Sequence, residues 1–420
     1  MELLLKDIGK IREASIKIDG ITVIAGENDT GKSTIGRSLF AVFNSFFNIK
    51  QRLVQERRDS IQKLLDSLYT NVVNRITSRI DVEEIAHRLV DESEVFRNNY
   101  ELLKEEIVKS IAQYDEYFSR YYEDNSVNEY VQRIMELLNI SDDEVLRQVL
   151  NNRIGSEFGG QISNIFTQDD SRIQLTVKNK KVTVKIKNDR VIEVQEKLDL
   201  MTEAIYLDDP YVLDDVSTVF RGSNRYADHR GHLRRKIIHP GSNTNVLEEI
   251  LINNKLEKIY EKIDSVCSGD IVKEKYRLGY KLQGTEKVLE TKNLSTGLKT
   301  FAILKTLLLN GAIEYNGTII LDEPEIHLHP EWQLLFAELI VLLHKEFNMH
   351  ILLNTHSPYF LRALQVYSAK HGVADKSKYY LSELREGKAY IVNVTDNIEK
   401  IYLKLSEPLQ KLEDMRWQND

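Results

Sequence analysis

The chain has 420 residues, of which 42% are hydrophobic and 29% are charged, so it can form two or three domains with buried cores. Its 57 basic and 65 acidic residues give a net charge of −8, which argues against a wholly basic surface but leaves a local basic site open. The single cysteine, Cys267, excludes a disulfide framework and a zinc site built on paired cysteines. Because the chain has no apolar run of about 18 residues, we expect a cytoplasmic protein without a membrane partner.

The first elements predict a strand, a phosphate-binding loop and a helix. Residues 21–25 form a β-branched apolar run, and apolar residues recur at helical spacing over 34–47. The intervening GENDTGKS, at 26–33, fits the pattern G-x-x-x-x-G-K-[ST]. Backbone N–H groups of such a loop and the N-terminus of the next helix point at a β-phosphate. The expected nucleotide-binding residues are Gly26, Asn28, Asp29, Thr30, Gly31, Lys32, Ser33 and Thr34.

Three side chains of this loop have separate expected roles. Lys32 supplies a cation to the β- and γ-phosphate oxygens and is predicted to be catalytic. Ser33 offers its hydroxyl to Mg²⁺, and Thr34 can reach the α-phosphate.

The next hundred residues predict acidic helices. Apolar residues lie three and four apart from about residue 50 to 150, for example over 61–73, 82–90, 100–118 and 142–150. Residues 51–150 hold 13 basic and 21 acidic side chains, so the whole net charge of −8 falls in this segment. Because acidic helices repel a phosphate backbone, the segment favours docking of a protein over binding of DNA. A solvated surface without a partner is an equal alternative.

Two basic stretches follow GSEFGG, a predicted linker at 155–160. Residues 173–189 alternate apolar and polar side chains around Asn179 and Lys180, which predicts a β-hairpin with a lysine-rich outer face. Protection of an exposed edge strand explains these lysines more simply than nucleic acid does. Residues 221–236 hold six Arg or Lys and one Asp. The spacing of His229 and His232 there matches no common metal motif, so we expect a basic loop.

A second anion site is predicted at NLSTGLKTF, residues 293–301, before an apolar helix. Ser295 is expected to cap that helix and to form the site together with the Gly297 N–H. The Lys32 loop already holds the phosphates of one nucleotide. We therefore expect the additional site to meet the γ-phosphate bound to another copy of the chain.

Two buried strands then place three polar residues at one edge of a sheet. TIILDEPE, at 318–325, ends in Asp322 and Glu323. Ligands lie at the carboxyl edge of open α/β sheets, so Asp322 is placed to hold Mg²⁺ through water and Glu323 to act as general base. A helix over 332–345 and a strand over 350–354 complete a parallel unit, which puts His356 at the same edge, near the γ-phosphate.

Four of these segments together resemble the motifs of the ABC-type ATPase superfamily. GENDTGKST resembles Walker A, NLSTGLKT the signature, IILDEPEIHLHP Walker B with the D-loop, and NTHSP the switch histidine. The last two are similar to the heads of SMC, RecF and OLD-family proteins. The greatest similarity is to those bacterial AAA-15 and AAA-21 type ATPases that are found as subunits of anti-phage systems such as Septu and PARIS.

The resemblance implies an α/β fold of the P-loop NTPase type. An ABC-type head, with a mixed, largely parallel sheet flanked by helices, is expected at 1–48 and 160–420, and an acidic all-helical insertion for partner docking at 49–159. It also implies a homodimer or larger oligomer that sandwiches two ATP molecules with Mg²⁺, with Ser295 and Gly297 acting in trans. Thr296, Leu298 and Lys299 depart from the usual signature.

The sequence gives weaker signals for recognition of the nucleotide base and for the Q-loop. No aromatic residue precedes Phe40, so the preference for ATP over GTP is implied by the resemblance alone. Gln161 is the Q-loop candidate.

These features favour an ATP hydrolase that regulates a separately encoded effector, a nuclease or toxin, in anti-phage defence. The 64 residues after His356 contain no Glu followed by DxD, so we expect no nuclease domain like that of the OLD nucleases. The alternative is a RecF-like repair ATPase that binds nucleic acid through residues 178–187 and 221–236. A transporter ATPase is disfavoured by the gap of about 260 residues between Walker A and the signature.

Overall fold

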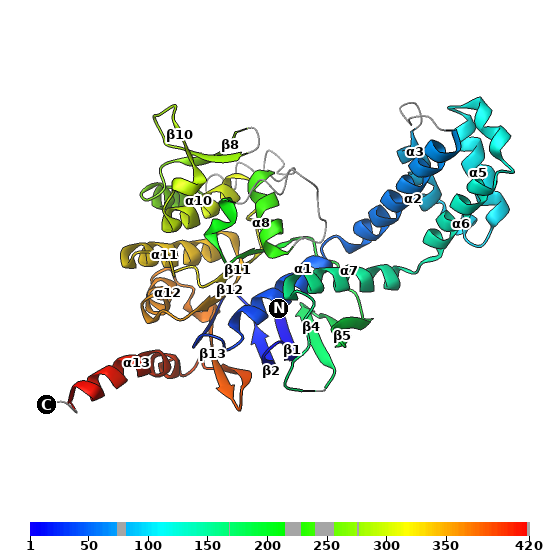
Figure 1. Cartoon of the computed structure of the whole chain (residues 1–420). Coiled ribbons are helices and arrows are strands. Elements are labelled where there is room, and N and C mark those ends of the chain that lie inside the picture. Colours follow the sequence, from blue (N-terminus) through cyan, green and yellow to red (C-terminus); the bar gives the residue numbers. More distant parts are fainter. Residues whose placement is uncertain (74–80, 168, 215–227, 240–255, 275–276, 418–420) are drawn as a thin grey trace. The chain divides into compact units, whose positions relative to one another are not determined.

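The computed structural model describes residues 1–73, 81–167, 169–214, 228–239, 256–274 and 277–417 (Figure 1). The chain divides into two compact units, Met1–Phe47 with Val149–Asp420, and Asn48–Gln148. The sequence-based division assigns residues 149–159 to the insertion, whereas here they lie in the first unit, within α7 (Asp142–Phe158) and the turn that follows it.

The first unit is built on one eleven-stranded sheet. Its strands, in the order in which they pair, are β6 (Arg190–Gln195), β5 (Lys180–Lys187), β4 (Ser171–Val177), β1 (Glu2–Ile8), β2 (Ile11–Lys17), β14 (Lys388–Asn393), β13 (Ser377–Arg385), β3 (Ile21–Gly26), β12 (His350–Thr355), β11 (Thr318–Asp322) and β7 (Ala204–Leu207). Strands β13, β3, β12, β11 and β7 are parallel, and β6 through β2 are antiparallel. The predicted α/β fold with a mixed sheet flanked by helices is therefore confirmed. The sheet is not largely parallel, however, because five of its ten strand pairings among the described residues are antiparallel.

Helices and a small second sheet complete this unit. Besides the end of α7, they include α1 (Lys32–Ser45), η2 (Pro210–Leu213), α8 (His229–Ile238), η4 (Thr291–Asn293), α10 (Thr296–Leu309), α11 (Pro330–Phe347), α12 (Pro358–Lys370), η5 (Ala374–Lys376) and α13 (Glu399–Trp417), with the sheet β10 (Val288–Glu290), β9 (Arg277–Lys281) and β8 (Asp270–Glu274). The predicted parallel unit of strand, helix and strand is present as β11, α11 and β12, with Asp322 opposite Asn354.

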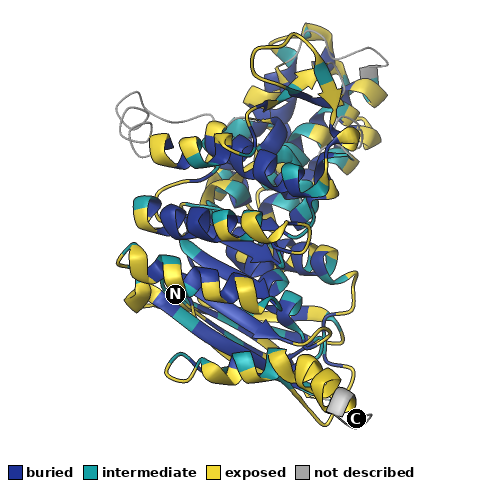
Figure 2. Ribbon diagram, turned by 90° about the vertical axis from the view of Figure 1, so that its left-hand side faces the viewer, coloured by how far each residue is buried: buried dark blue, intermediate teal, exposed yellow. Residues whose placement is uncertain are grey.

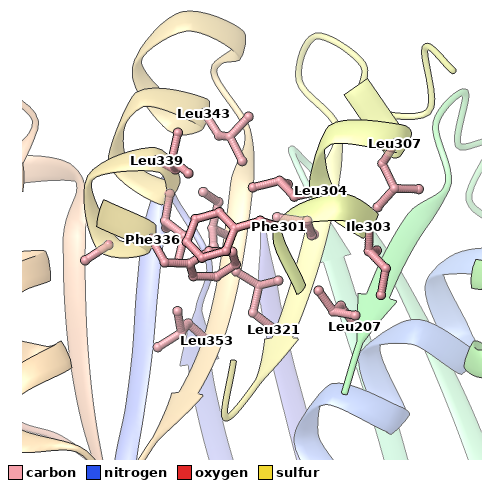
Figure 3. Close-up of a cluster of buried hydrophobic side chains, with 14 of the residues drawn as sticks. Leu207, Phe301, Ile303, Leu304, Leu307, Leu321, Phe336, Leu339, Leu343 and Leu353 are labelled. Carbon is pink, nitrogen blue, oxygen red and sulfur yellow. The ribbon is translucent and has the colours of Figure 1, made fainter. Parts of the chain in front are cut away.

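Helices cover both faces of the parallel strands, and buried residues line the sheet beneath them (Figure 2). Every residue of β3 and β11 is accordingly buried, and most of them are apolar. On one face, Phe301 of α10 and Phe336 of α11 pack over Leu321 (Figure 3). Neighbouring residues of a strand point to opposite faces, and α1 approaches the other face, where a Cβ on Gly36 would lie 3.0 Å from Ile320. Helices α1 and α10 therefore lie on opposite faces of the sheet.

The structure confirms the predicted hairpin but forms helices in parts of the predicted linker and the predicted basic loop. The predicted hairpin is confirmed as β4 and β5, but β5 lies between β4 and β6 and is not an edge strand, so edge protection does not explain its lysines. The predicted linker is wrong at 155–158, which form the end of α7. The predicted basic loop is wrong at 229–236, which lie in α8, while 221–227 fall outside the described residues.

The second unit is helical, as its apolar spacing predicts. Its elements are α2 (Ile49–Val73), α3 (Val82–Asp91), α4 (Ser93–Phe96), α5 (Tyr100–Ala112), η1 (Glu116–Tyr121), α6 (Asn125–Asn139) and the beginning of α7. A core of its own includes Leu65, Leu89 and Ile107. The helix predicted over 100–118 is interrupted after Ala112, because the Asp115 side chain caps a new 3₁₀ turn. Among the described helices, none is long and apolar enough to cross a bilayer.

Candidate functional site

The phosphate loop connects the end of β3 to the start of α1. Two glycines are required by its geometry, because a Cβ on Gly26 would lie 2.6 Å from the Ser382 carbonyl oxygen and Gly31 has a φ of 84° at the helix N-cap. The Ser382 hydroxyl donates a hydrogen bond of 2.7 Å to the Thr30 carbonyl. Strand β13 thus fixes the loop from its neighbouring position in the sheet.

The Lys32 side chain is held inside this loop and is 4% exposed. Its Nζ donates hydrogen bonds to the Gly26 carbonyl at 3.0 Å and the Glu27 carbonyl at 2.7 Å. Burial lowers the pKa of Lys32, and the charges of Glu323 and Asp322 act in the opposite direction. The Lys32 amine is therefore a hydrogen-bond donor that is already held in place at the N-terminus of α1.

A cavity of about 510 Å³ opens beside the loop. Its lining includes the predicted residues Asn28, Asp29, Thr30, Gly31, Lys32, Ser33, Thr34 and Glu323. Gly26 ends β3 at the base of the loop and is not part of the lining, and neither are Ser295 and Gly297. Gln161, the Q-loop candidate, does line the cavity.

Four lining residues were not predicted, namely Gly9, Lys10, Ser163 and Ile165. Gly9 and Lys10 form the turn between β1 and β2, and Lys10 forms an ion pair with Asp29 of the loop. Nothing in the local sequence marks this turn as part of the site, because only the order of strands in the sheet brings it there.

Asp322 ends β11 at the carboxyl edge of the sheet and is 9% exposed. Tyr206 Oη donates to its Oδ2 at 2.8 Å, and Asn354 Nδ2 donates to its Oδ1 at 2.9 Å. Tyr206 Oη also lies 3.5 Å from the Ser33 carbonyl oxygen, so Ser33 and Asp322 are both next to the Tyr206 hydroxyl. The Ser33 side-chain hydroxyl and the Asp322 carboxylate are hard oxygen ligands of the kind that suits Mg²⁺.

Glu323 lies next to the phosphate loop in a strained conformation. Its φ is 50°, and its N–H donates to the Asn354 carbonyl at 3.0 Å. Its Oε1 lies 3.6 Å from Lys32 Nζ and 3.3 Å from His356 Nδ1. The fold therefore brings together the three residues that the sequence suggests as catalytic.

The signature segment lies elsewhere, at the start of α10. Ser295 caps this helix as predicted, its Oγ accepting a hydrogen bond of 3.4 Å from the Leu298 N–H. Gly297 has no room for a side chain, since a Cβ would lie 2.9 Å from the His327 carbonyl oxygen. Because α10 packs on the face of the sheet opposite to α1, this N-terminus is separate from the Lys32 cavity.

Two departures from the usual signature have contacts within the chain. Thr296 Oγ1 lies 3.1 Å from the Tyr211 hydroxyl, within hydrogen-bond distance. Lys299 is buried, and its Nζ forms an ion pair of 2.6 Å with Asp214. Both residues thus connect α10 to η2 and the residue that follows it.

The histidines of α8 face carboxylates. His229 contacts Glu157 and Asp208, and His232 contacts Glu203 at 3.1 Å. Although burial alone would lower the pKa of His229, its hydrogen bonds with Asp208 and Glu157 raise it to about 9. Within the described part of the chain, no cluster of three or more His, Cys, Asp or Glu is arranged to hold a metal.

Comparison with known proteins gives one family and several solved structures. Residues 1–361 match the family described as AAA ATPase domain, AAA_15. An SMC head domain from Thermotoga maritima is 12% identical, with a TM-score of 0.38 over 94% of this chain and 98% of that chain. An Smc head domain with a coiled coil and joint from Pyrococcus yayanosii is 14% identical, with a TM-score of 0.37 over 97% of this chain and 99% of that chain.

Proposed function

The chain belongs to the AAA ATPase domain family, and on this premise we propose that it binds ATP with Mg²⁺ and hydrolyses the γ-phosphate. The observation that carries the proposal is the position of Glu323, with His356 at 3.3 Å and Lys32 at 3.6 Å, beside the phosphate loop. In this proposal Glu323 is the base, Lys32 is the cation, and His356 is a hydrogen-bond donor to the γ-phosphate.

Each residue has one role in the proposal. The loop N–H groups and the N-terminus of α1 bind the phosphates in the cavity, and Lys32 turns its donors from the Gly26 and Glu27 carbonyls to phosphate oxygens. Glu323 accepts the proton of the attacking water, and His356 donates to the γ-phosphate.

Magnesium fits the donors present at this site. Ser33 and Asp322 would hold it, directly or through water, and the ion would neutralise charge on the phosphate oxygens.

A dimer completes the site in this proposal. Ser295 and Gly297 form an anion-binding helix N-terminus that does not line the Lys32 cavity of their own chain. A second copy would bring its own Ser295 and Gly297 to the γ-phosphate in trans. Each of the two nucleotides would then lie between one phosphate loop and the partner's signature.

The biological role proposed is regulation of a separately encoded effector, a nuclease or toxin, in cytoplasmic anti-phage defence. The acidic second unit is the proposed docking surface, and the single cysteine suits a reducing compartment. The test is to purify the tagged chain from its native host and identify the proteins that co-purify. A nuclease-like or toxin-like protein in fixed ratio supports the proposal, and the absence of any stoichiometric partner contradicts it.

One observation favours the RecF-like alternative. Lys178, Lys180 and Lys181, at the turn between β4 and β5 and the start of β5, are all exposed. If they bind DNA, ATP-dependent DNA binding should weaken with salt and should be lost on changing Lys180 and Lys181 to Glu. DNA binding that is insensitive to both changes would remove this candidate.

A further inference from the structure

A buried tyrosine holds the carboxylate that the proposed function assigns to Mg²⁺. Tyr206 lies on β7, next to β11, and is 0% exposed. Its hydroxyl has one proton, and the 2.8 Å contact with Asp322 Oδ2 is the shorter and stronger of its two contacts. With Asn354 bonded to the other oxygen, both oxygens of Asp322 are fixed.

The tyrosine ring is itself confined from two sides. Its face stacks on the His229 ring, with centroids 4.3 Å apart and an angle of 25° between the planes. On the side of α1, a Cβ on Gly36 would lie 3.0 Å from Tyr206 Oη. The Tyr206 side chain therefore contacts His229 on one side and α1 on another.

His229 is in turn fixed by the end of α7. Its Nδ1 lies 2.7 Å from Glu157 Oε2, and its backbone N–H donates to Glu157 Oε1 at 2.6 Å. Its Nε2 lies 3.0 Å from Asp208 Oδ2, and Arg230 donates to the same carboxylate. Glu157 is buried in the last turn of α7, the helix whose first residues belong to the second unit.

We propose that Tyr206 is a positioning residue that holds Asp322 for the metal, and that Glu157 and His229 hold Tyr206, so that the end of α7 is coupled to the metal site. The inference rests on the proposed function. Residues that hydrogen-bond to a metal-coordinating side chain set the orientation of that side chain. Their loss commonly weakens metal binding by about 10- to 100-fold. Movement of α7 would thereby change the affinity for Mg²⁺-nucleotide.

The test measures metal binding directly, with Mn²⁺ as the probe. The free Mn²⁺ signal in electron paramagnetic resonance is titrated with the full chain and saturating ADP. Tyr206→Phe removes only the hydroxyl, and we expect Mn²⁺ affinity to fall about tenfold while ADP affinity in EDTA stays unchanged. Mn²⁺ affinity equal to that of the wild type would overturn the positioning role.

The matched control is Tyr280→Phe. Tyr280 is also a buried tyrosine, its hydroxyl accepting a hydrogen bond of 2.8 Å from the Gly269 N–H, and it lies on β9 in the small sheet. We expect it to lower the melting temperature without changing Mn²⁺ affinity. A similar loss of Mn²⁺ affinity in this control would mean that any buried tyrosine matters and would contradict a specific role.

A double-mutant cycle tests the connection to α7. Glu157→Gln should weaken Mn²⁺ binding by a smaller factor, and combining it with Tyr206→Phe should add nothing, because Glu157 acts through the Tyr206 hydroxyl. Additive losses would overturn the coupling. A wild-type chain that binds no ADP with Mn²⁺ would instead contradict the proposed function and is thereby distinguishable from failure of this inference.

Discussion

At the residue scale, the Glu323 carboxylate lies within ion-pair distance of both Lys32 and His356. If it activates water, Glu323→Gln keeps the shape and the metal site but removes the base. We expect ATP hydrolysis to fall by roughly 10² or more, with ATP still bound and the dimer accumulating in light scattering. Hydrolysis at the wild-type rate would show that another group, such as His356, orients the water.

A substitution of the neighbouring Asp322 should affect nucleotide binding, a step that precedes hydrolysis. Asp322→Asn replaces a carboxylate, whose two oxygens accept one hydrogen bond each from Tyr206 and Asn354, by an amide. We therefore expect weaker binding of Mg²⁺-ATP, measured by calorimetry, with little change for ATP in EDTA. Equal losses with and without Mg²⁺ would argue against a metal role for this residue.

The residues of this site divide by what the sequence can reveal. Lys32, Asp322 and Glu323 belong to contiguous motifs at the ends of buried strands: the phosphate loop follows β3, Asp322 is the last residue of β11, and Glu323 follows it. The motif and the element therefore predict their positions together. Tyr206 lies 116 residues before Asp322 in the chain and carries no local signal. Its role depends on β7 pairing with β11 at the edge of the sheet, which no short pattern specifies.

At the element scale, two helical glycines have opposite environments. A Cβ on Gly36 of α1 would lie 3.0 Å from Tyr206 and Ile320, whereas one on Gly155 of α7 would meet no atom within 4 Å. Overpacking costs about 1–3 kcal/mol, and relief of glycine in a helix gains about 1 kcal/mol. We expect Gly36→Ala to lower the free energy of unfolding and Gly155→Ala to raise it, as measured in urea. Shifts of the same sign would contradict this account of the α1 packing.

The same α7 glycine shows where local propensity misleads. The segment GSEFGG contains three glycines, which favour a linker, yet residues 155–158 are helical because Glu157 is held by His229 from α8. In α8 itself, Asp228 caps the helix and both histidines are buried against carboxylates. Contacts across the sequence therefore convert a predicted linker and a predicted loop into helices.

At the scale of the whole molecule, the acidic second unit should matter for partners and not for chemistry. Glu94, Glu105 and Glu129 are exposed on α4, α5 and α6. Changing all three to Gln should reduce the amount of partner recovered from the native host and leave ATP hydrolysis unchanged. Lys63→Gln with Lys109→Gln, at exposed positions of α2 and α5, is the control that should keep the partner. Equal recovery with both variants would contradict acidic docking.

The arrangement of two copies gives the sharpest prediction for the molecule. Ser295→Arg blocks the signature, and Lys32→Ala removes the cation that binds the phosphates. Neither chain alone should therefore hydrolyse ATP. In a mixed dimer, one site combines the intact Lys32 of the first chain with the intact Ser295 of the second, while the other site has neither. Because half of the dimers are mixed and each has one working site of two, roughly a quarter of the wild-type rate should return. A chain with both substitutions, mixed with Ser295→Arg, forms no intact site and should stay inactive. If the first mixture is as inactive as its parents, Ser295 does not act on the nucleotide of another copy, and the anion site at α10 needs a different ligand.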